Sequence, residues 1–164
     1  MKFRGSLFRA TNPIYAREPL SGEGARLHGG RFNRRGRPAL YLALDPVTVI
    51  REMARGGTLQ PTVVVEISAE IENLFDTRDP AALAVQSANV ATLADPAWRL
   101  KMLSREPVPT HELSEKLIAR GHPGMIVRSF APGTGENDLN IVLWKWGENT
   151  AARLRLVDDE GRLR

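Results

Sequence analysis

The most informative absence in this sequence is that of cysteine, because none of its 164 residues is a cysteine. The chain therefore has no disulfide bonds, no thiolate ligands for zinc or iron–sulfur clusters, and no thiol nucleophile. Histidine is scarce as well, since there are only His28, His111 and His122, and no two of them have metal-ligand spacing. We therefore expect no metal centre.

Long apolar segments are also missing. No run approaches the roughly 18 apolar residues of a membrane-spanning helix, and residues 1–6 lack the apolar stretch of a secretion signal. With 42% hydrophobic and 26% charged residues, the composition is typical of a globular protein. The length suits one domain, and no repeat or linker divides it. We predict a single cytoplasmic domain over residues 1–164 that does not contact membranes.

Acidic residues are few in the N-terminal third. Residues 1–55 contain 11 Lys and Arg against 4 Asp and Glu, a balance of +7, whereas residues 56–164 contain 12 against 15, a balance of −3. Of the 23 basic residues, 19 are arginine, which codon usage in a G+C-rich genome explains equally well. The clustering favours an anionic partner for this third: a phosphorylated small molecule, a nucleic acid or an acidic protein.

Three Asp-Pro pairs predict where helices begin: Asp45-Pro46, Asp79-Pro80 and Asp95-Pro96. In each pair the aspartate can accept hydrogen bonds from the first N–H groups of a helix, while proline occupies the first helical position. A further helix is expected before Gly121, which Pro123 follows closely. The predicted helices span about residues 46–55, ended by Gly56-Gly57, about 80–93, about 96–104 and about 111–120.

Short runs rich in β-branched residues lie between these helices. The strongest is Thr62–Ser68, which contains three valines and an isoleucine. The elements do not alternate regularly between strand and helix, as they do in a parallel doubly wound sheet. We therefore predict an α+β fold with a central mixed or antiparallel sheet. The predicted strands are residues 7–9, 39–43, 62–68, 125–130, 141–146 and 154–157.

Two glycine-rich segments resemble phosphate-binding loops but lack the rest of the motif. Gly22-Glu23-Gly24 has no third glycine at the spacing of a dinucleotide-binding fingerprint, and Gly133-Thr134-Gly135 lacks the Gly-Lys-Ser/Thr of a P-loop. We interpret both as turns. The chain also has no Gly-x-Ser-x-Gly sequence, so a serine hydrolase is not supported.

The segment Gly29–Ala43 carries the most information. Gly29-Gly30 lets the backbone approach a ligand closely, and in an extended chain the side chains of Arg31 and Asn33 point to the same side. A guanidinium beside exposed N–H groups suits a phosphate or pyrophosphate, so we predict that Gly30, Arg31 and Asn33 contact an anionic ligand. The other basic residues here are expected on a solvated hairpin tip: Arg34, Arg35 and Arg37.

Four further residues each have a structural and a functional interpretation. Tyr41 is either a core residue or the cover of a planar heterocycle. Glu52 lies away from the centre of the apolar face of its predicted helix, which favours a solvent-facing position. Because this helix follows the segment just described, a position in the same cleft is the alternative for Glu52. Ser129 and Asn140 either have structural roles or bind sugar hydroxyls.

Together these residues resemble the RES-domain family, which is named after an arginine, a glutamate and a serine. The resemblance covers nearly the whole chain and implies a fold similar to that of ADP-ribosyltransferases. Phe32 departs from the pattern, because a Trp or Tyr is expected there. The matching residues are Arg31 in Gly29-Gly30-Arg31-Phe32-Asn33, then Pro38-Ala39-Leu40-Tyr41-Leu42-Ala43, then Glu52, and Ser129 in Val127-Arg128-Ser129-Phe130.

The resemblance implies a toxin of a bacterial type II toxin–antitoxin module that consumes NAD+, with an antitoxin that carries an Xre-like helix-turn-helix. It implies that Glu52 stabilises the positive charge that develops as the nicotinamide–ribose bond breaks. Arg31 would hold the pyrophosphate, Tyr41 would pack on the nicotinamide or its ribose, and Ser129 would orient the ribose. NAD+ is then a consumed substrate, and no metal is needed.

Several functions stay open at this point. The resemblance implies either mono-ADP-ribosylation of a host protein, towards which we lean, or cleavage of NAD+ with phosphate or water as acceptor. The basic N-terminal third alternatively indicates a nucleic-acid-binding module without enzymatic activity, or an interaction protein that only binds an acidic antitoxin. Against nucleic acid, aromatic residues make up only 6% of the chain and no nucleic-acid-binding motif is readable. A toxin of this kind would meet DNA only indirectly, through its antitoxin.

Overall fold

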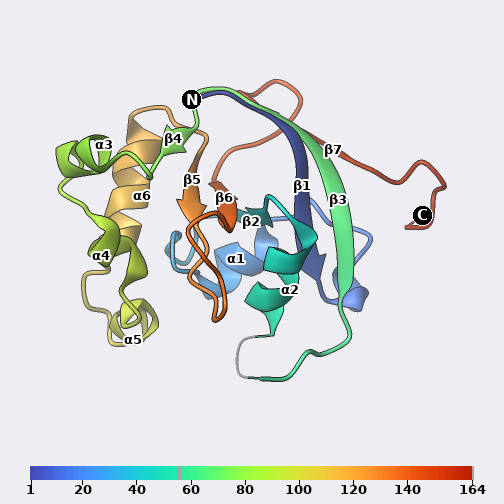
Figure 1. Ribbon diagram of the computed structural model, residues 1–164, viewed down its shortest axis with the longest axis horizontal. Coiled ribbons are helices and arrows are strands. Elements are labelled where there is room, and N and C mark those ends of the chain that lie inside the picture. The colour runs from blue at the N-terminus through green and yellow to red at the C-terminus, as the bar shows by residue number, and fades with distance from the viewer. Residues whose placement is uncertain (55–56, 164) are drawn as a thin grey trace.

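The computed structural model describes residues 1–54 and 57–163, in which one seven-stranded sheet has the strand order β4-β5-β6-β2-β1-β3-β7 (Figure 1). The short β4 runs parallel to β5, and every other pair of neighbours in this order is antiparallel. The sheet is therefore mixed, as predicted. Its strands are β1 (Phe3–Thr11), β2 (Leu40–Ala43), β3 (Val63–Ile71), β4 (Phe75–Asp76), β5 (Gly124–Arg128), β6 (Leu139–Leu143) and β7 (Ala152–Leu156).

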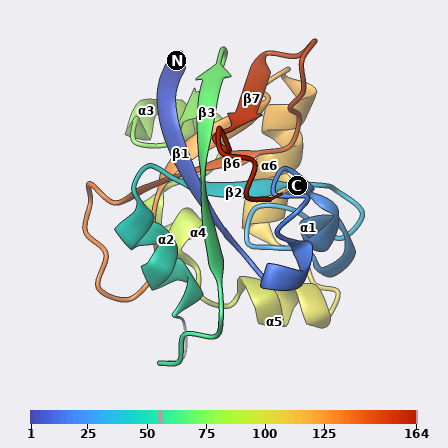
Figure 2. The same cartoon turned by 90° about the vertical axis from the view of Figure 1, so that its right-hand side faces the viewer.

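The helices lie in separate places around this sheet. α2 packs against β1 and β2, whereas α3, α4, α5 and α6 form a layer beside β4 and β5 (Figures 1 and 2). This arrangement confirms the predicted α+β class. The helices are the 3-10 helix η1 (Pro13–Tyr15), α1 (Glu23–His28), α2 (Pro46–Met53), α3 (Pro80–Val85), α4 (Val90–Ala94), α5 (Trp98–Leu103) and α6 (Pro109–Ala119). Within the described residues, none of them combines the length and the apolar character that crossing a bilayer requires.

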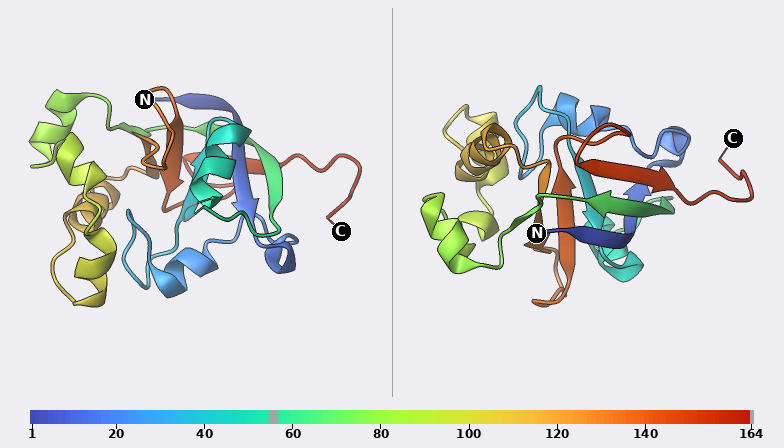
Figure 3. Two further views of the ribbon diagram at one scale, coloured as in Figure 1. Left: turned by 60° about the horizontal axis from the view of Figure 1, so that its bottom comes forward. Right: turned by 90° about the horizontal axis from the view of Figure 1, so that it is seen from above.

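The sheet bends between β1 and β2, which share a single residue pair, Phe8 with Ala43. Strands on the two sides of this bend run in different directions (Figure 3). Both halves bury apolar side chains in one cluster, which we call the strand core. It consists of Leu7, Leu40, Leu42, Val65, Ile67, Ala69, Ile71, Leu74, Ile126, Ile141, Leu143 and Ala152.

A second cluster, which we call the helical core, lies on the opposite face of β5 and β6. Because side chains alternate along a strand, Ile126 and Ile141 face the strand core, whereas Val127 and Val142 face the helical core. This second face also presents Asn140, two residues from Val142. The helical core consists of Phe32, Ala39, Phe75, Leu83, Ala88, Leu93, Leu113, Leu117, Met125, Val127, Val142 and Trp144.

The predicted helix ends are partly correct. Asp45 begins α2 as expected, since its side chain accepts a hydrogen bond from the Thr48 N–H at 2.9 Å. α2 ends at Met53, and Gly56 of the predicted Gly56-Gly57 stop lies outside the described residues. The interpretation of Gly22-Glu23-Gly24 as a turn was wrong, because Gly22 is the N-cap of α1.

The predicted helix over 80–93 is in fact two helices, α3 and α4. Ser87 between them has a φ of 60°, which a continuous α-helix does not allow, and Asn89 caps α4 by accepting from the Thr92 N–H. The third Asp-Pro pair starts a turn rather than a helix. The Asp95 side chain accepts a hydrogen bond from the Ala97 N–H at 2.8 Å, and α5 begins only at Trp98.

Candidate active site

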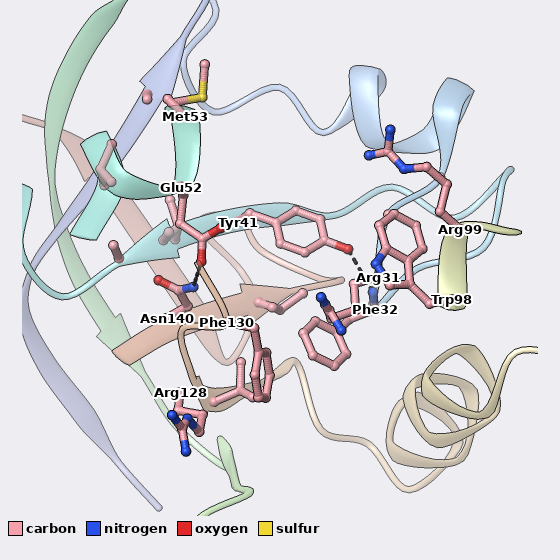
Figure 4. Close-up of a pocket in the computed structure, with 18 residues that line it drawn as sticks. Arg31, Phe32, Tyr41, Glu52, Met53, Trp98, Arg99, Arg128, Phe130 and Asn140 are labelled. Atoms are coloured by element: carbon pink, nitrogen blue, oxygen red, sulfur yellow. Dashed lines mark hydrogen bonds between the residues drawn. The ribbon is translucent and has the colours of Figure 1, made fainter. Parts of the chain in front are cut away.

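A cavity of about 290 Å³ lies on the sheet face that also carries the helical core (Figure 4). β2, β5 and β6 form its floor, α2 one wall, and the loop Gly29–Phe32 together with α5 the other. Its volume is at the lower end of the roughly 300–1,000 Å³ of small-molecule sites. The polar and charged side chains that line it are Arg31, Tyr41, Glu52, Arg99, Arg128 and Asn140.

Glu52 points from α2 into this cavity, and among the described residues the side chains of Ser129 and Asn140 bind its carboxylate. The Ser129 hydroxyl donates to Glu52 Oε1 at 2.5 Å, and Asn140 Nδ2 donates to the same oxygen at 2.9 Å. The Asn140 bond is visible in Figure 4. Asn140 belongs to β6, and Ser129 directly follows β5. Two adjacent strands thus fix the carboxylate of a helix that precedes both in sequence.

The solvent-facing position that the periodicity favoured for Glu52 was wrong. Along α2 the apolar side chains of Val47, Ile50 and Met53 are the exposed ones, at 53%, 43% and 41%, whereas Thr48 is completely buried. Thr48 and Val49 are the residues that α2 buries. Because residues three and four apart share one face of a helix, Glu52 lies on this same side and points into the cavity.

Ser129 is completely buried and contacts the cavity only through Glu52. Its N–H donates to the Asp138 carbonyl at 2.6 Å, and its hydroxyl oxygen accepts from the Ala131 N–H at 3.2 Å. The hydroxyl therefore has both a donor and an acceptor partner within the protein. A direct contact between Ser129 and a ribose stays a prediction.

Tyr41, Asn33 and Gly30 form one connected unit at the cavity wall. The Tyr41 hydroxyl donates to Asn33 Oδ1 at 2.7 Å and accepts from the Phe32 N–H at 3.0 Å. Burial raises the pKa of Tyr41 well above its usual value, so this hydroxyl stays protonated. The ring and Gly30 line the cavity, whereas Asn33 is completely buried behind them.

The extended chain expected from Arg31 to Asn33 is instead a tight turn. The Gly30 N–H donates to the Asn33 carbonyl at 2.9 Å, and Asn33 Nδ2 donates to the Ala25 and Arg37 carbonyls at 2.8 and 2.9 Å. The side chains of Arg31 and Asn33 consequently lie apart: Arg31 lines the cavity, and Asn33 ties the turn to α1. A ligand contact of Asn33 stays a prediction.

Three distant side chains fix the carbonyls of this turn, and sequence reasoning did not identify any of them. His111 Nε2 lies 2.7 Å from the Gly30 carbonyl oxygen. Thr110 Oγ1 donates to the Arg31 carbonyl at 2.5 Å, and Trp144 Nε1 donates to the Phe32 carbonyl at 2.8 Å. Desolvation lowers the pKa of His111, so it is neutral near pH 7. No local pattern signals these contacts, because they join residues about 80 or more positions apart.

Arg31 lies across the cavity from Glu52, between two aromatic rings. Its guanidinium carbon is 5.1 Å from the centre of the Phe130 ring and 5.9 Å from that of Trp98, distances typical of cation–π contacts. Its Nη1 donates to the Leu93 and Asp95 carbonyls at 3.1 and 2.9 Å. Arg31 therefore holds the end of α4 and the turn before α5 against the cavity.

Arg99 and Arg128 also line the cavity, and the sequence analysis gave neither a role. Arg99 lies over the Trp98 ring at 5.2 Å, and Arg128 over the Phe130 ring at 5.7 Å. Arg128 Nε and Asn140 Oδ1 are buried and make no hydrogen bond within the part of the chain that the structure describes. Buried polar atoms of this kind normally have a partner, so they mark positions where a polar ligand or water fits.

The predicted solvated hairpin tip is only partly solvated. Arg37 forms two hydrogen bonds with Glu115 of α6, at 3.0 and 2.7 Å, and Arg34 lies 3.3 Å from the same carboxylate. These bonds to Arg37 lower the pKa of Glu115. Arg35 is exposed, as expected.

Among the described residues, no group of three or more acidic or histidine side chains could hold a metal ion.

Replacing Gly30 with alanine, G30A, is expected to destabilise the protein by about 1–3 kcal/mol, the cost of overpacking a filled site. A Cβ at this position would lie 2.4 Å from the Tyr41 hydroxyl and 2.6 Å from Asn33 Oδ1, so the turn would have to shift. Thermal unfolding measures the effect. The matched control is Gly24→Ala in α1, where a Cβ would meet nothing within 4 Å and alanine favours the helix. Equal melting temperatures for the two variants would contradict the packing argument.

Comparisons with known proteins bear on this arrangement. Among curated proteins, Toxin Res from Photorhabdus laumondii is 40% identical over 47 residues, which are 29% of this chain and 30% of that protein. The match therefore spans less than a third of that relative. Among solved structures, a chain of the M. tuberculosis MbcT–MbcA toxin–antitoxin complex has the same fold, with a TM-score of 0.57 and 19% identity over 94% of this chain and 83% of that chain.

The family comparison covers almost the whole sequence. The sequence profile described as the RES domain matches residues 6–164. This range includes every side chain that lines the cavity, and with it the arginine, the glutamate and the serine for which the resemblance was noted. The chain belongs to the RES-domain family.

Proposed function

We propose that this protein is the toxin of a bacterial toxin–antitoxin module and that it cleaves the nicotinamide–ribose bond of NAD+. The observation that carries the proposal is the carboxylate of Glu52, which Ser129 and Asn140 fix at one end of a cavity with three arginines. Family membership and the relatives named as toxins support it. A diphosphate carries two negative charges, which a cavity with this excess of positive charge suits.

Breaking the nicotinamide–ribose bond makes the anomeric carbon positive, as in an oxocarbenium ion. A carboxylate that is already fixed in place stabilises such charge without reorganising during the reaction. In this proposal Glu52 faces the reacting ribose, and its two hydrogen-bond donors keep Oε1 from rotating away. Ser129 then acts through Glu52 as a positioning residue, which differs from the direct ribose contact expected from the sequence.

Nicotinamide leaves as a neutral ring, so the reaction needs no strong general acid. His111 is neutral and bonded to the carbonyl of Gly30, which lines the cavity. In the proposal Tyr41 packs against the nicotinamide or its ribose, and Arg31 binds the pyrophosphate between the Trp98 and Phe130 rings. Gly30 keeps the backbone close to the substrate.

We lean towards mono-ADP-ribosylation of a host protein as the second half of the reaction. Phosphate and water are the alternative acceptors, and all three share the first half, in which the carbon–nitrogen bond breaks. Incubation with labelled NAD+ distinguishes them by product: a labelled protein in cell lysate, ADP-ribose 1″-phosphate with added phosphate, or free ADP-ribose. The module further implies an antitoxin partner with an Xre-like helix-turn-helix and action in the cytoplasm, where NAD+ is available.

Assaying free nicotinamide after incubating purified protein with NAD+ tests the proposal. We expect nicotinamide to accumulate well beyond one equivalent of protein and to stop when the antitoxin is added. A protein that releases none, and that instead binds bare DNA or RNA with a steep dependence on salt, would contradict the proposal and favour the nucleic-acid-binding alternative. Inactive protein that binds only the antitoxin would favour a pure interaction role.

A further inference from the structure

α5 forms the end of the cavity opposite Glu52, and the reaction proposed above gives its Arg99 no role of its own. It contributes two consecutive residues to the lining, Trp98, which is buried, and Arg99, which is exposed. In Figure 4 these two side chains lie across the cavity from Glu52 and Asn140, with Arg31 and Tyr41 between. A ligand that extends away from Glu52 past Arg31 therefore reaches α5.

Arg99 is a cation that is held by an aromatic ring and not by an acid. Its guanidinium carbon lies 5.2 Å from the centre of the Trp98 ring. Within the described residues it forms no ion pair and no hydrogen bond, in contrast to surface arginines such as Arg26 with Glu23 or Arg78 with Asp76. The contact with Trp98 keeps the guanidinium beside the cavity, and its N–H groups, which bond to no other described residue, can bind an external anion.

The cavity is too small to enclose a whole dinucleotide, so part of such a ligand extends beyond it. At about 290 Å³ it is small for a dinucleotide, because whole ligand sites run to roughly 1,000 Å³. At the end near Glu52, Asn140 and Val127 of the sheet form the floor. With the nicotinamide ribose at Glu52 and the pyrophosphate at Arg31, the adenosine half must continue along α5.

Hydrogen bonds through Asp95 also connect Arg31 to α5. Arg31 Nη1 binds the Asp95 carbonyl, while the Asp95 carboxylate accepts from the Ala97 N–H and from Lys101 Nζ, at 2.8 and 2.6 Å. The hydrogen bond from Lys101 lowers the pKa of Asp95, which therefore stays ionised near neutral pH. Arg31 thus sets the position of α5, and Arg99 is carried at a fixed place relative to it.

We propose that Arg99 binds the adenosine-side phosphate of NAD+ and is the residue that makes the site prefer a dinucleotide over nicotinamide mononucleotide, which lacks that phosphate. The inference rests on the proposed function for the choice of ligand. Its structural basis is the planar, acid-free guanidinium on Trp98 at the open end of the cavity. Arg31 then contacts the phosphate nearer the nicotinamide ribose.

Equilibrium binding tests this inference separately from the reaction. In a Glu52→Gln background, which slows consumption of the ligand, calorimetry gives the affinities for NAD+ and for nicotinamide mononucleotide. The measured quantity is the affinity for NAD+ divided by the affinity for nicotinamide mononucleotide. Adding Arg99→Ala is expected to lower this ratio about tenfold, the factor that 1.4 kcal/mol produces. Arg99→Lys should lose less, because it keeps the charge but not the plane. The control is Arg120→Ala at the end of α6, an exposed arginine outside the cavity, which should keep the ratio.

The outcomes separate the two proposals. A ratio that stays the same in Arg99→Ala, or falls equally in Arg120→Ala, would overturn the role of Arg99 whether or not the protein cleaves NAD+. A ratio that falls only in the Arg99 variants supports it, even if the unaltered protein releases no nicotinamide. In that last case the proposed reaction fails, and the recognition of the dinucleotide stands.

Discussion

Replacing Glu52 with glutamine, E52Q, is expected to lower the turnover of NAD+ by about 10²–10³-fold, the scale for losing one fixed electrostatic group. The amide has nearly the shape of the carboxylate and can still accept hydrogen bonds from Ser129 and Asn140, so the wall of the cavity stays in place. What it lacks is the negative charge opposite the ribose carbon. The rate of nicotinamide release measures the effect, and thermal unfolding checks that the variant is folded.

The matched control is Glu112→Gln, which removes the same charge from an exposed position on α6, outside the cavity. It should keep the parent rate. Normal nicotinamide release by E52Q would show that the carboxylate does not act on the reaction, and the proposed function would then have to be abandoned. A loss of the same size in both variants would indicate an effect of net charge and not of Glu52.

Removing the side chain of Arg31, as in R31A, is expected to weaken the use of NAD+ by about 1.5–3 kcal/mol, the scale for a hydrogen bond to a charged group. Two losses contribute. The pyrophosphate loses its guanidinium, and the Leu93 and Asp95 carbonyls lose the donor that holds α5 at the cavity. The measurement is kcat/KM for nicotinamide release.

Arg31→Lys separates these two contributions. Lysine keeps a positive charge, but it lacks the guanidinium plane that lies between the rings of Trp98 and Phe130. Its single nitrogen would also have to serve both the two carbonyls and the pyrophosphate. If positioning of α5 matters as the structure indicates, the lysine variant recovers only a small part of the lost activity. An R31A protein whose NAD+ affinity and turnover both match the parent would contradict the pyrophosphate role.

Local signals in the sequence predicted the parts of the fold that depend on neighbouring residues. Asp45 and Pro46 marked the start of α2 correctly, because capping involves groups three positions apart. The β-branched run after Pro61 predicted β3, although the strand extends to Ile71. The segment around Gly30 and Arg31 was identified as part of a site, and it does line the cavity.

The orientation of individual side chains depended on contacts that no local pattern contains. The apolar pattern of α2 favoured a solvent-facing Glu52, but the helix buries Thr48 and Val49, and the distant Ser129 and Asn140 bind the Glu52 carboxylate at the cavity. Asn33 was placed beside Arg31, whereas a turn closed by the Gly30 N–H buries it, and its side chain binds Tyr41 and the Ala25 and Arg37 carbonyls. Such bonds become visible only once the strands are paired.

The basic N-terminal third shows the same limit. Its excess charge indicated an external anion, yet several of its cations form ion pairs with acids from the remainder of the chain. Among the described residues of this third, Arg31 is the arginine that lines the cavity. The fold therefore pairs part of the excess positive charge internally. The ion pairs between the N-terminal third and the remainder of the chain are Lys2–Glu72, Arg4–Glu70, Arg34–Glu115, Arg37–Glu115 and Arg51–Asp138.

The two walls of the cavity rest on different cores. Glu52 belongs to α2, which packs on β1 and β2 of the strand core, whereas the Arg31 turn and α5 lean on Phe32 and Leu93 of the helical core. The strands β5 and β6 contribute side chains to both cores, Ile126 and Ile141 to one and Val127 and Val142 to the other. The width of the cavity between Glu52 and α5 is therefore set by how the two cores pack against the same pair of strands.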